Sequence, residues 1–341
     1  MRQQRIDAFR FYTLFMVICA HVRLFGGLNH GSLPAELLEL GFVIGARFTI
    51  PFFFIVSGYF LGGKIVQEPS RAIPIASRYT KKLAKVFLFW CAIYAVEKPL
   101  QESGFTYGIL RPTWWYLSWL VKEEPIRLMF EGTIVHLWFL VSLILTVWLF
   151  ALWPFDKKSN RFLLLGGVLY VCGLLGGSYK VTPFGFDAHF NTRNGIFFGT
   201  LFFAIGVAFH NRMPRVNKTT ASCIALIGLA IFCLEAYYLR LQWSVSPIQH
   251  DYLLGTVPFG VGVALLALTH QDSTIDRLVG PYGRYTLGVY ASHMLFLDLW
   301  RPFGSFVQPI VWQFMFPILV FGSSLLTSII VSRTPLRCVV V

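Results

Sequence analysis

Long apolar stretches recur along the whole chain, separated by short polar segments rich in proline, lysine and arginine. A helix needs about 20 mainly apolar residues to cross the hydrocarbon layer of a membrane, which is about 30 Å thick. The pattern therefore predicts an all-α, polytopic membrane bundle of about ten transmembrane helices. We place these helices near 8–27, 41–63, 82–100, 134–153, 161–178, 194–210, 219–240, 252–270, 282–300 and 308–332.

The composition excludes a soluble domain. Hydrophobic residues make up 56% of the chain and charged residues only 13%, against about 25% charged residues in an ordinary soluble protein. The mean hydropathy of +0.63 reflects these long apolar segments. We expect a single integral membrane domain over residues 1–341, with no separate soluble domain. No repeat relates the two halves, which counts against transporter folds built from inverted repeats.

Positive charges indicate the orientation of the helices. If the N-terminus is cytoplasmic, the loops on that side hold most of the 29 lysines and arginines. Cytoplasmic loops typically carry such an excess, so we expect both termini to face the cytoplasm in the inner membrane. The 64–85 loop then lies inside and the 101–133 loop outside. The net charge of +13 is thus a topological signal and does not indicate a nucleic-acid partner.

Six cysteines are scattered along the chain, and none forms a CxxC pair. Metal sites and disulfide frameworks usually show regular cysteine spacings. We therefore expect neither a disulfide framework nor a metal site.

The first predicted helix carries two ionisable side chains on one face. Arg10 and His21 are 11 positions apart, so they point within about 20° of the same direction and about 16.5 Å apart along the axis. Such a pair can line one channel, with a cation at its cytoplasmic mouth and a titratable base deeper in. The alternative is that Arg10 is a positive-inside anchor and His21 an interfacial histidine.

Further along the chain, Arg47 lies in an apolar segment ahead of PFFFIVSGY (51–59), which contains a Ser-Gly pair. Asp7, Arg10 and His21 precede this segment. Three further stretches follow it, namely HLWFLVSLI (136–144), NTRNGIFFGTLFFAIG (191–206) and YTLGVYASHMLFLD (285–298). In this order and at these intervals, the stretches resemble the acyltransferase family 3 membrane proteins, which O-acylate cell-envelope sugars. The resemblance spans essentially the whole chain.

The resemblance implies an acyl-CoA-dependent O-acetyltransferase that takes part in polysaccharide modification, with succinyl as another acyl group to consider. Cytoplasmic acetyl-CoA would be the donor, and a cell-envelope glycan or lipid-linked sugar outside the membrane the acceptor. The family carries a basic RxxR-type motif before its third helix, and here RYTKK supplies Arg78 and Lys81. The donor phosphates would then contact Arg10, Arg78, Lys81 and Lys82. Positive-inside anchoring explains the same cluster without a ligand.

Within this framework His21 would be the general base that activates the acceptor hydroxyl. Arg47 would stabilise the oxyanion, or else form a structural ion pair, for instance with Glu97. His136 and Arg193 would contact the acceptor, although His136 can equally be an interfacial anchor. A buried hydrogen bond is the role we expect for His293.

Outer-loop residues Asp187 and His189 can also bind sugar hydroxyls, or they can be ordinary solvated residues. Two other classes of protein stay open. A transporter of a glycan or small molecule would also have many helices and buried charges. A structural or sensory membrane protein would leave Arg10, His21 and Arg47 without a role.

Overall fold

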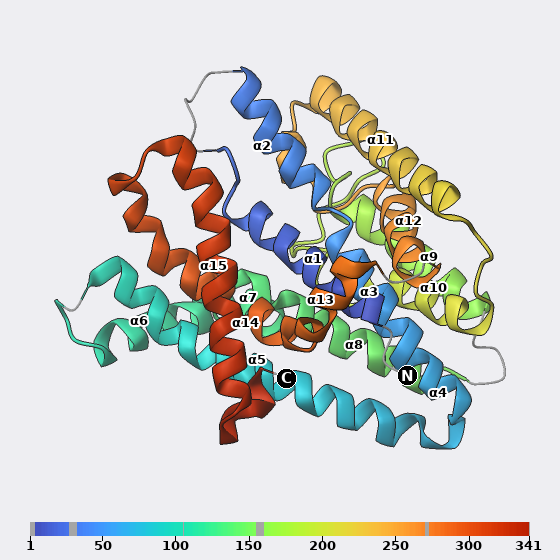
Figure 1. Ribbon diagram of the computed structural model, residues 1–341, viewed down its shortest axis with the longest axis horizontal. Coiled ribbons are helices and arrows are strands. Elements are labelled where there is room, and N and C mark those ends of the chain that lie inside the picture. The colour runs from blue at the N-terminus through green and yellow to red at the C-terminus, as the bar shows by residue number, and fades with distance from the viewer. Residues whose placement is uncertain (1–3, 27–32, 105, 155–159, 270–272, 341) are drawn as a thin grey trace.

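Helices form nearly all the regular structure of the computed structural model, which describes residues 4–26, 33–104, 106–154, 160–269 and 273–340 (Figure 1). The longer α-helices are α1 Gln4–His21, α2 Leu33–Gly45, α3 Thr49–Ser57, α5 Ala72–Ser103, α6 Leu110–Glu123, α8 Trp138–Leu152, α9 Asn160–Gly176, α10 Gly199–Asn211, α11 Lys218–Trp243, α12 Thr256–Thr269, α14 Thr286–Trp300 and α15 Pro309–Ser332. The shorter helical elements are η1 Gly58–Gly62, α4 Gly63–Gln67, η2 Pro69–Arg71, α7 Pro125–Glu131, η3 Val135–Leu137, η5 Pro247–Gln249, α13 Thr274–Val279, η6 Gly280–Tyr285, η7 Arg301–Phe306 and η8 Pro335–Val339. No strand occurs among these described residues.

Each of the ten predicted segments overlaps a helix or a run of consecutive helices, although residues 22–26 and 194–198 form turns and residues 27 and 270 lie outside the described residues. Within the described part of the chain, four helical runs are long and apolar enough to cross a membrane: Glu36–Gln67, Val135–Leu152, Lys218–Trp243 and Pro309–Ser332. Three apolar helices are shorter, namely Asn160–Gly176, Gly199–Asn211 and Thr256–Leu268. The membrane character of the fold is thus confirmed, while the number of about ten crossings stays a prediction.

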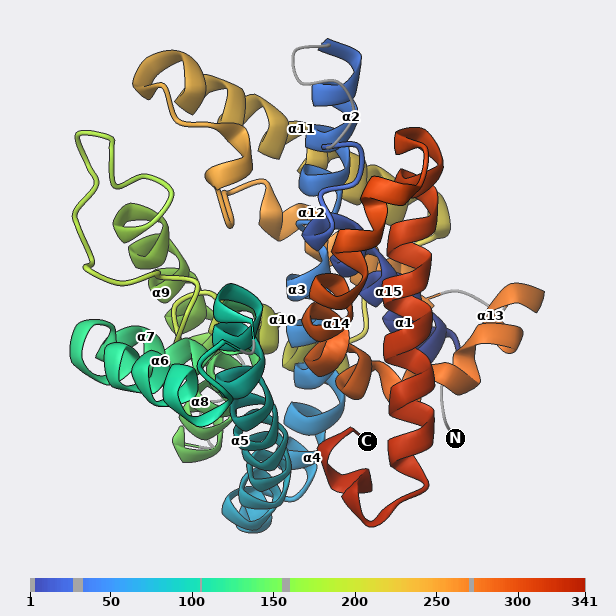
Figure 2. The ribbon, with the colours of Figure 1, turned by 90° about the vertical axis from the view of Figure 1, so that its left-hand side faces the viewer.

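The elements sort toward two ends of the bundle. In Figure 2, the start of α1, α4 and η8 lie in the lower half of the view. The loop after α9 and the loop after α11 lie in the upper half. This grouping matches the loops that the positive-inside rule places together. Which end faces the cytoplasm stays a prediction.

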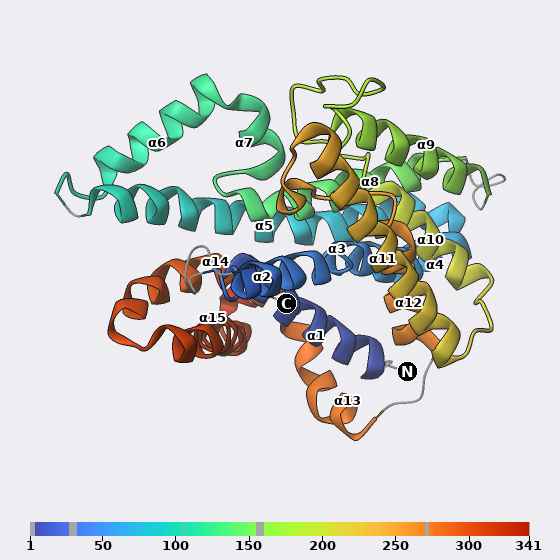
Figure 3. The ribbon, with the colours of Figure 1, turned by 90° about the horizontal axis from the view of Figure 1, so that it is seen from above.

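Two additional helices occupy the predicted 101–133 loop. Figure 3 shows that α6 and α7, which precede α8 in the sequence, fold back beside α5. Trp114, Trp115 and Trp119 on α6 are all exposed, as is typical of aromatic anchors at a membrane interface. The sequence analysis did not predict these helices.

Close contact between α3 and α10 positions the outer ends of both helices. A Cβ atom added at Gly58 would lie 2.0 Å from the carbonyl oxygen of Phe203, and one added at Gly206 would lie 2.0 Å from that of Ile55. The two backbones therefore touch, as small residues allow at helix interfaces in membranes. Because Arg47 precedes α3 and Arg193 precedes α10, this packing brings the two arginines toward the same end of the bundle.

Candidate active site

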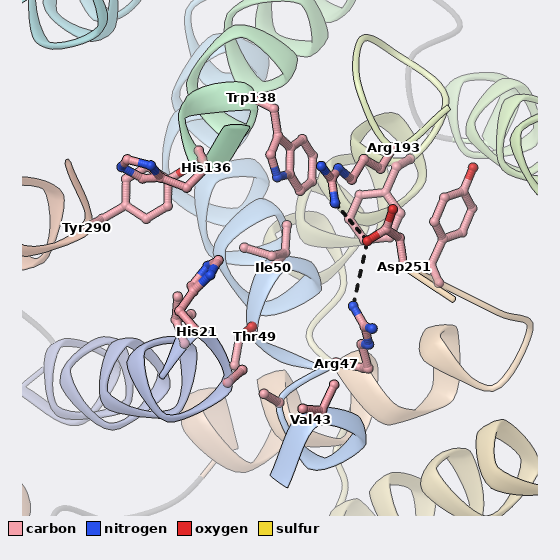
Figure 4. A pocket seen from close by; sticks show the side chains of 15 residues that line it. His21, Val43, Arg47, Thr49, Ile50, His136, Trp138, Arg193, Asp251 and Tyr290 are labelled. Carbon is pink, nitrogen blue, oxygen red and sulfur yellow. Dashed lines mark hydrogen bonds and ion pairs between the residues drawn. The ribbon is translucent and has the colours of Figure 1, made fainter. Parts of the chain in front are cut away.

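Four of the predicted site residues meet at one cavity. His21, Arg47, His136 and Arg193 line a space of about 240 Å³ (Figure 4). They come from the end of α1, the turn before α3, η3 and the loop before α10. His21 is exposed because it borders this space. We call this space the outer cavity.

A cluster of three histidines lies at the outer cavity. The ring centroid of His293 lies 5.1 Å from that of His21 and 4.9 Å from that of His136. His293 is fully buried and His136 is 3% exposed. Among the described residues, no group of three His, Cys, Asp or Glu side chains is placed to hold a metal ion.

Backbone carbonyls fix the tautomers of two of these histidines. His293 Nδ1 lies 2.6 Å from the Tyr290 carbonyl oxygen, and His136 Nε2 lies 3.3 Å from that of Ala291. Because a carbonyl oxygen only accepts, the ring nitrogen in each pair must carry the hydrogen when the ring is neutral. His293 Nε2 and His136 Nδ1 are then acceptors, and both are buried without a hydrogen-bond partner. The expected buried hydrogen bond of His293 is confirmed. The sequence did not predict that the other ring nitrogen, Nε2, would be buried without a partner.

The two arginines of the outer cavity share a carboxylate. Arg193 donates to Asp251 over 2.8 Å, and Arg47 lies 3.7 Å from the same oxygen (Figure 4). Arg47 also donates to the carbonyl oxygen of Ile248 over 2.7 Å. The Nε atoms of both arginines are buried without a partner. The expected alternative of a structural ion pair for Arg47 is confirmed. The partner suggested from the sequence, Glu97, is wrong, because the loop before α12 brings Asp251 to Arg47 instead.

Electrostatics keep Asp251 ionised. Burial raises the pKa of this carboxyl, but the guanidinium groups of Arg193 and Arg47 and a hydrogen bond from Asn191 outweigh burial, so the pKa lies below its usual 3.8. A carboxylate that bridges two arginines holds both in place. Arg193 additionally lies 3.6 Å from Glu131 and packs over the Trp138 ring.

Cationic side chains line a second cavity, which lies toward the other end of the bundle and which we call the inner cavity. It measures about 260 Å³, and Arg10, Lys82 and Arg284 line it together with Ser57 and Tyr290. Here α3 gives way to the π-helical turn η1, directly after Ser57. Such turns often mark functional sites.

Two members of the predicted donor cluster lie outside the lining of the inner cavity. Arg78 and Lys81 are exposed on α5, within one helical turn of Lys82. Arg10 is half-buried and forms an ion pair with Asp7 at 2.9 Å. The predicted cluster is thus divided, with Arg10 and Lys82 at the cavity and the other two on the surface beside it.

Tyr290 connects the two cavities, because its side chain lines both of them. Its hydroxyl donates to the carbonyl oxygen of His136. Arg10 lines the inner cavity and His21 the outer cavity, although both lie on α1. Each side chain borders one of two neighbouring cavities, so a single channel along this face of the helix stays a prediction.

Sequence reasoning missed three residues of this arrangement. Tyr290 falls inside the family-like stretch 285–298, so its neighbourhood was singled out but not the residue itself. Arg284 was counted only as a positive-inside charge. Asp251 gave no signal, because a lone aspartate in a polar loop is usually solvated.

The chain is 27% identical over 272 residues to a serine/alanine racemase of Enterococcus gallinarum, covering 76% of this chain and 36% of that protein. It is 24% identical over 322 residues to an amino-acid racemase of Enterococcus faecalis, covering 90% of this chain and 42% of that protein. The chain thus spans about two fifths or less of these relatives.

No solved structure gives a significant match. A family model described as an acyltransferase domain matches residues 3–333. This match covers nearly the whole chain and every residue of the two cavities. The chain therefore belongs to this acyltransferase family, as its sequence motifs predicted.

Proposed function

We propose that the protein transfers an acyl group, acetyl in the first instance, from acyl-CoA to a hydroxyl of a glycan or lipid-linked sugar across the inner membrane. One observation carries the proposal. A cavity lined by cations and a cavity that holds two of the histidines lie on either side of Tyr290, which lines both. Donor and acceptor would enter from opposite ends and react beside this residue.

The inner cavity suits the donor. Coenzyme A carries phosphates, and Arg10, Lys82 and Arg284 supply cations that bind phosphate oxygens. Arg78 and Lys81, exposed on α5 beside Lys82, would attract the nucleotide to the mouth of the cavity. The pantetheine arm would then pass Tyr290 and carry the thioester toward His21.

The outer cavity suits the chemical step. His21 would take the proton of the acceptor hydroxyl while the hydroxyl oxygen attacks the thioester carbonyl carbon. The unpaired Nε–H of Arg47 would stabilise the oxyanion that forms. When the carbon–sulfur bond breaks, the departing thiolate would take the proton from the His21 imidazolium. The products are an O-acyl ester and free coenzyme A.

His136 and Arg193 would orient the acceptor. The unpartnered Nδ1 of His136 can accept a hydrogen bond from a sugar hydroxyl. Arg193 is held by Asp251 and can donate through its free Nε. Both side chains border the space into which the attacking hydroxyl must fit.

The experiment that tests this function measures product and coenzyme A together. Purified protein is given acetyl-CoA labelled in the acetyl group and glycan from the envelope of the cells that make it. We expect one free thiol for every labelled ester on the glycan. Free serine is tested as a further acceptor, because one relative is named a serine/alanine racemase and serine carries a hydroxyl. Uptake of glycan without thiol release would favour the transporter alternative.

A further inference from the structure

A third cavity opens beside the outer cavity, between two loops far apart in the sequence. It measures about 600 Å³ and lies between residues 176–192 and residues 245–252. Figures 2 and 3 both show the loop after α9 beside the loop after α11. Asn191 donates to Asp251 across the two loops, and Ser178 donates to the carbonyl oxygen of Tyr252. The size falls within the range of about 300–1,000 Å³ that is usual for small-molecule sites.

The lining of this cavity matches an uncharged polyol. Side-chain amides, hydroxyls and imidazoles surround it, with the Phe190 ring at one side. Such groups both donate and accept hydrogen bonds, as sugar hydroxyls do. The charged side chains of the lining are Lys180, Asp187 and the ionised Asp251. Two carboxylates against one ammonium group do not favour a phosphate or another strongly anionic ligand.

His250 is the feature that a purely structural cavity would not explain. It is 1% exposed, and its Nε2 is buried without a hydrogen-bond partner. Burial lowers the pKa of His250 to about 4, and Arg47 acts in the same direction. The imidazole is therefore neutral near pH 7 and offers one donor and one acceptor. A buried polar atom without a partner costs free energy unless a ligand or water satisfies it.

The third cavity adjoins the outer cavity. Asp251 and Tyr252 line both of them, and Arg47 lies 3.7 Å from Asp251. A ligand in the third cavity therefore lies next to the residues that border the proposed site of reaction. Nothing in the sequence predicted this connection, because it depends on two loops that meet only in the folded protein.

We propose that this third cavity is an acceptor vestibule, which binds the sugar units next to the one whose hydroxyl is acylated. The inference rests on the proposed function, because it names the part of the acceptor that the site recognises outside the reacting sugar. Hydrogen bonds from His250 and Asn191 hold these units, while Gln249 lies at the edge of the cavity. A longer acceptor is then bound more tightly than a single sugar.

The test blocks the vestibule without touching the reacting groups. Gln249 is exposed at its edge, so Gln249→Cys in a cysteine-free background accepts a maleimide with a bulky polyethylene glycol chain. Ser305→Cys, exposed on η7 and outside the lining of all three cavities, is the matched control. A small thiol reagent that adds only a methylthio group is the second control.

The acceptors are oligosaccharides cut from the envelope glycan of the producing cells, the same oligosaccharides on their lipid carrier, and the monosaccharides released from them. The bulky label at position 249 should raise the KM for both oligosaccharide forms at least tenfold. The KM for acetyl-CoA and transfer to monosaccharides should not change, and neither control should have an effect. Equal transfer to oligosaccharides before and after blocking would contradict the vestibule. An effect confined to the lipid-linked form would also contradict it, because recognition would then belong to the carrier.

A binding measurement separates this inference from the proposed function. Equilibrium dialysis with labelled oligosaccharide is carried out on the His21→Ala variant, which cannot use the proposed base. Binding that the bulky label at position 249 abolishes supports the vestibule even if the wild-type protein proves not to transfer acyl groups. Transfer by the wild-type protein together with binding that the label leaves intact would retain the transferase and overturn the vestibule.

Discussion

The rings of His21 on α1 and His293 on α14 lie with their centroids 5.1 Å apart and their planes inclined by 44°. His293 donates through Nδ1 to a backbone carbonyl, so its buried Nε2 is a free acceptor in the same cluster. A proton that His21 removes from a hydroxyl therefore has a second base nearby. His293 is thus a neighbour of the proposed base His21. The helix periodicity that related Arg10 to His21 could not predict this neighbour.

His21→Ala should abolish acyl transfer while leaving the amount of membrane-inserted protein unchanged. Loss of a general base typically lowers the rate by about 10²–10⁴-fold. The readout is kcat with labelled acetyl-CoA and envelope glycan. His210→Ala is the matched control, because this histidine lies outside the cavities and contacts Gln67. A His21→Ala variant that keeps more than about a tenth of the activity would remove His21 from the catalytic role.

His293→Asn tests the positioning role of the second histidine. Asparagine can keep the donor to the Tyr290 carbonyl through its amide nitrogen, while the acceptor nitrogen in the His21 cluster is lost. We expect kcat to fall about tenfold, or about 1.4 kcal/mol in the barrier, and the pH profile of kcat/KM to shift. A merely structural residue would change the melting temperature and leave the pH profile as it is, which is the result that would count against this role.

Much of the architecture was predictable from the sequence, because apolar runs long enough to form helices are a strong local signal. Each of the ten predicted segments overlaps a helix. The helices α6 and α7 were missed because their segment mixes prolines, charges and tryptophans, so it lacks an apolar run. The helix α1 is not among the four described helical runs that are long and apolar enough to cross a membrane, since Arg5, Asp7 and Arg10 all lie within it.

The candidate site was predictable only in part. Arg10 and His21 could be related through helix periodicity, since both lie on one element. The partner of Arg47 could not be deduced in this way. Glu97 lies in an apolar helix and stood out, whereas Asp251 lies in a loop whose place is set by tertiary packing. Pairings between loops depend on the whole fold and leave little trace in local sequence.

Asp251→Asn should destabilise the protein in a pH-dependent way. The folded pKa of Asp251 is depressed, so its contribution is complete above the unfolded value of 3.8 and is lost as the pH falls through the folded pKa. Breaking charged hydrogen bonds of this kind costs about 1–3 kcal/mol. The melting temperature in detergent should therefore differ from wild type at pH 7 and converge with it as the pH falls through the lowered pKa of Asp251.

The control for this experiment is Asp187→Asn, because Asp187 is well exposed and its side chain contacts only the neighbouring His189 among the described residues. We expect little change in melting temperature for that variant. A deficit of Asp251→Asn that stays constant from pH 7 to pH 3 would mean that the ionised carboxylate does not hold the two arginines.

Donor affinity should depend on the cations that line the inner cavity more than on those beside it. Lys82→Ala and Arg284→Ala should each raise the KM for acetyl-CoA with a smaller change in kcat. The double variant Arg78→Ala/Lys81→Ala should act mainly at low salt, because these two charges lie outside the lining and would attract the donor only over a longer distance, which salt screens. The readout is KM for the donor at two ionic strengths. An unchanged KM for acetyl-CoA in both Lys82→Ala and Arg284→Ala would mean that these cations do not bind the donor and serve only as positive-inside anchors.

The central claim is that the acyl group crosses the membrane while coenzyme A and the glycan stay on their own sides. It is tested in sealed vesicles with acetyl-labelled acetyl-CoA outside, at the face predicted to be cytoplasmic, and glycan enclosed at the other face. Orientation is checked with an impermeant thiol reagent, which should label Ser70→Cys from the donor side and leave Ser305→Cys unlabelled. We predict that label appears on the enclosed glycan and that free coenzyme A remains outside. Glycan that crosses without donor, or label that appears only when donor and glycan share one face, would contradict the account.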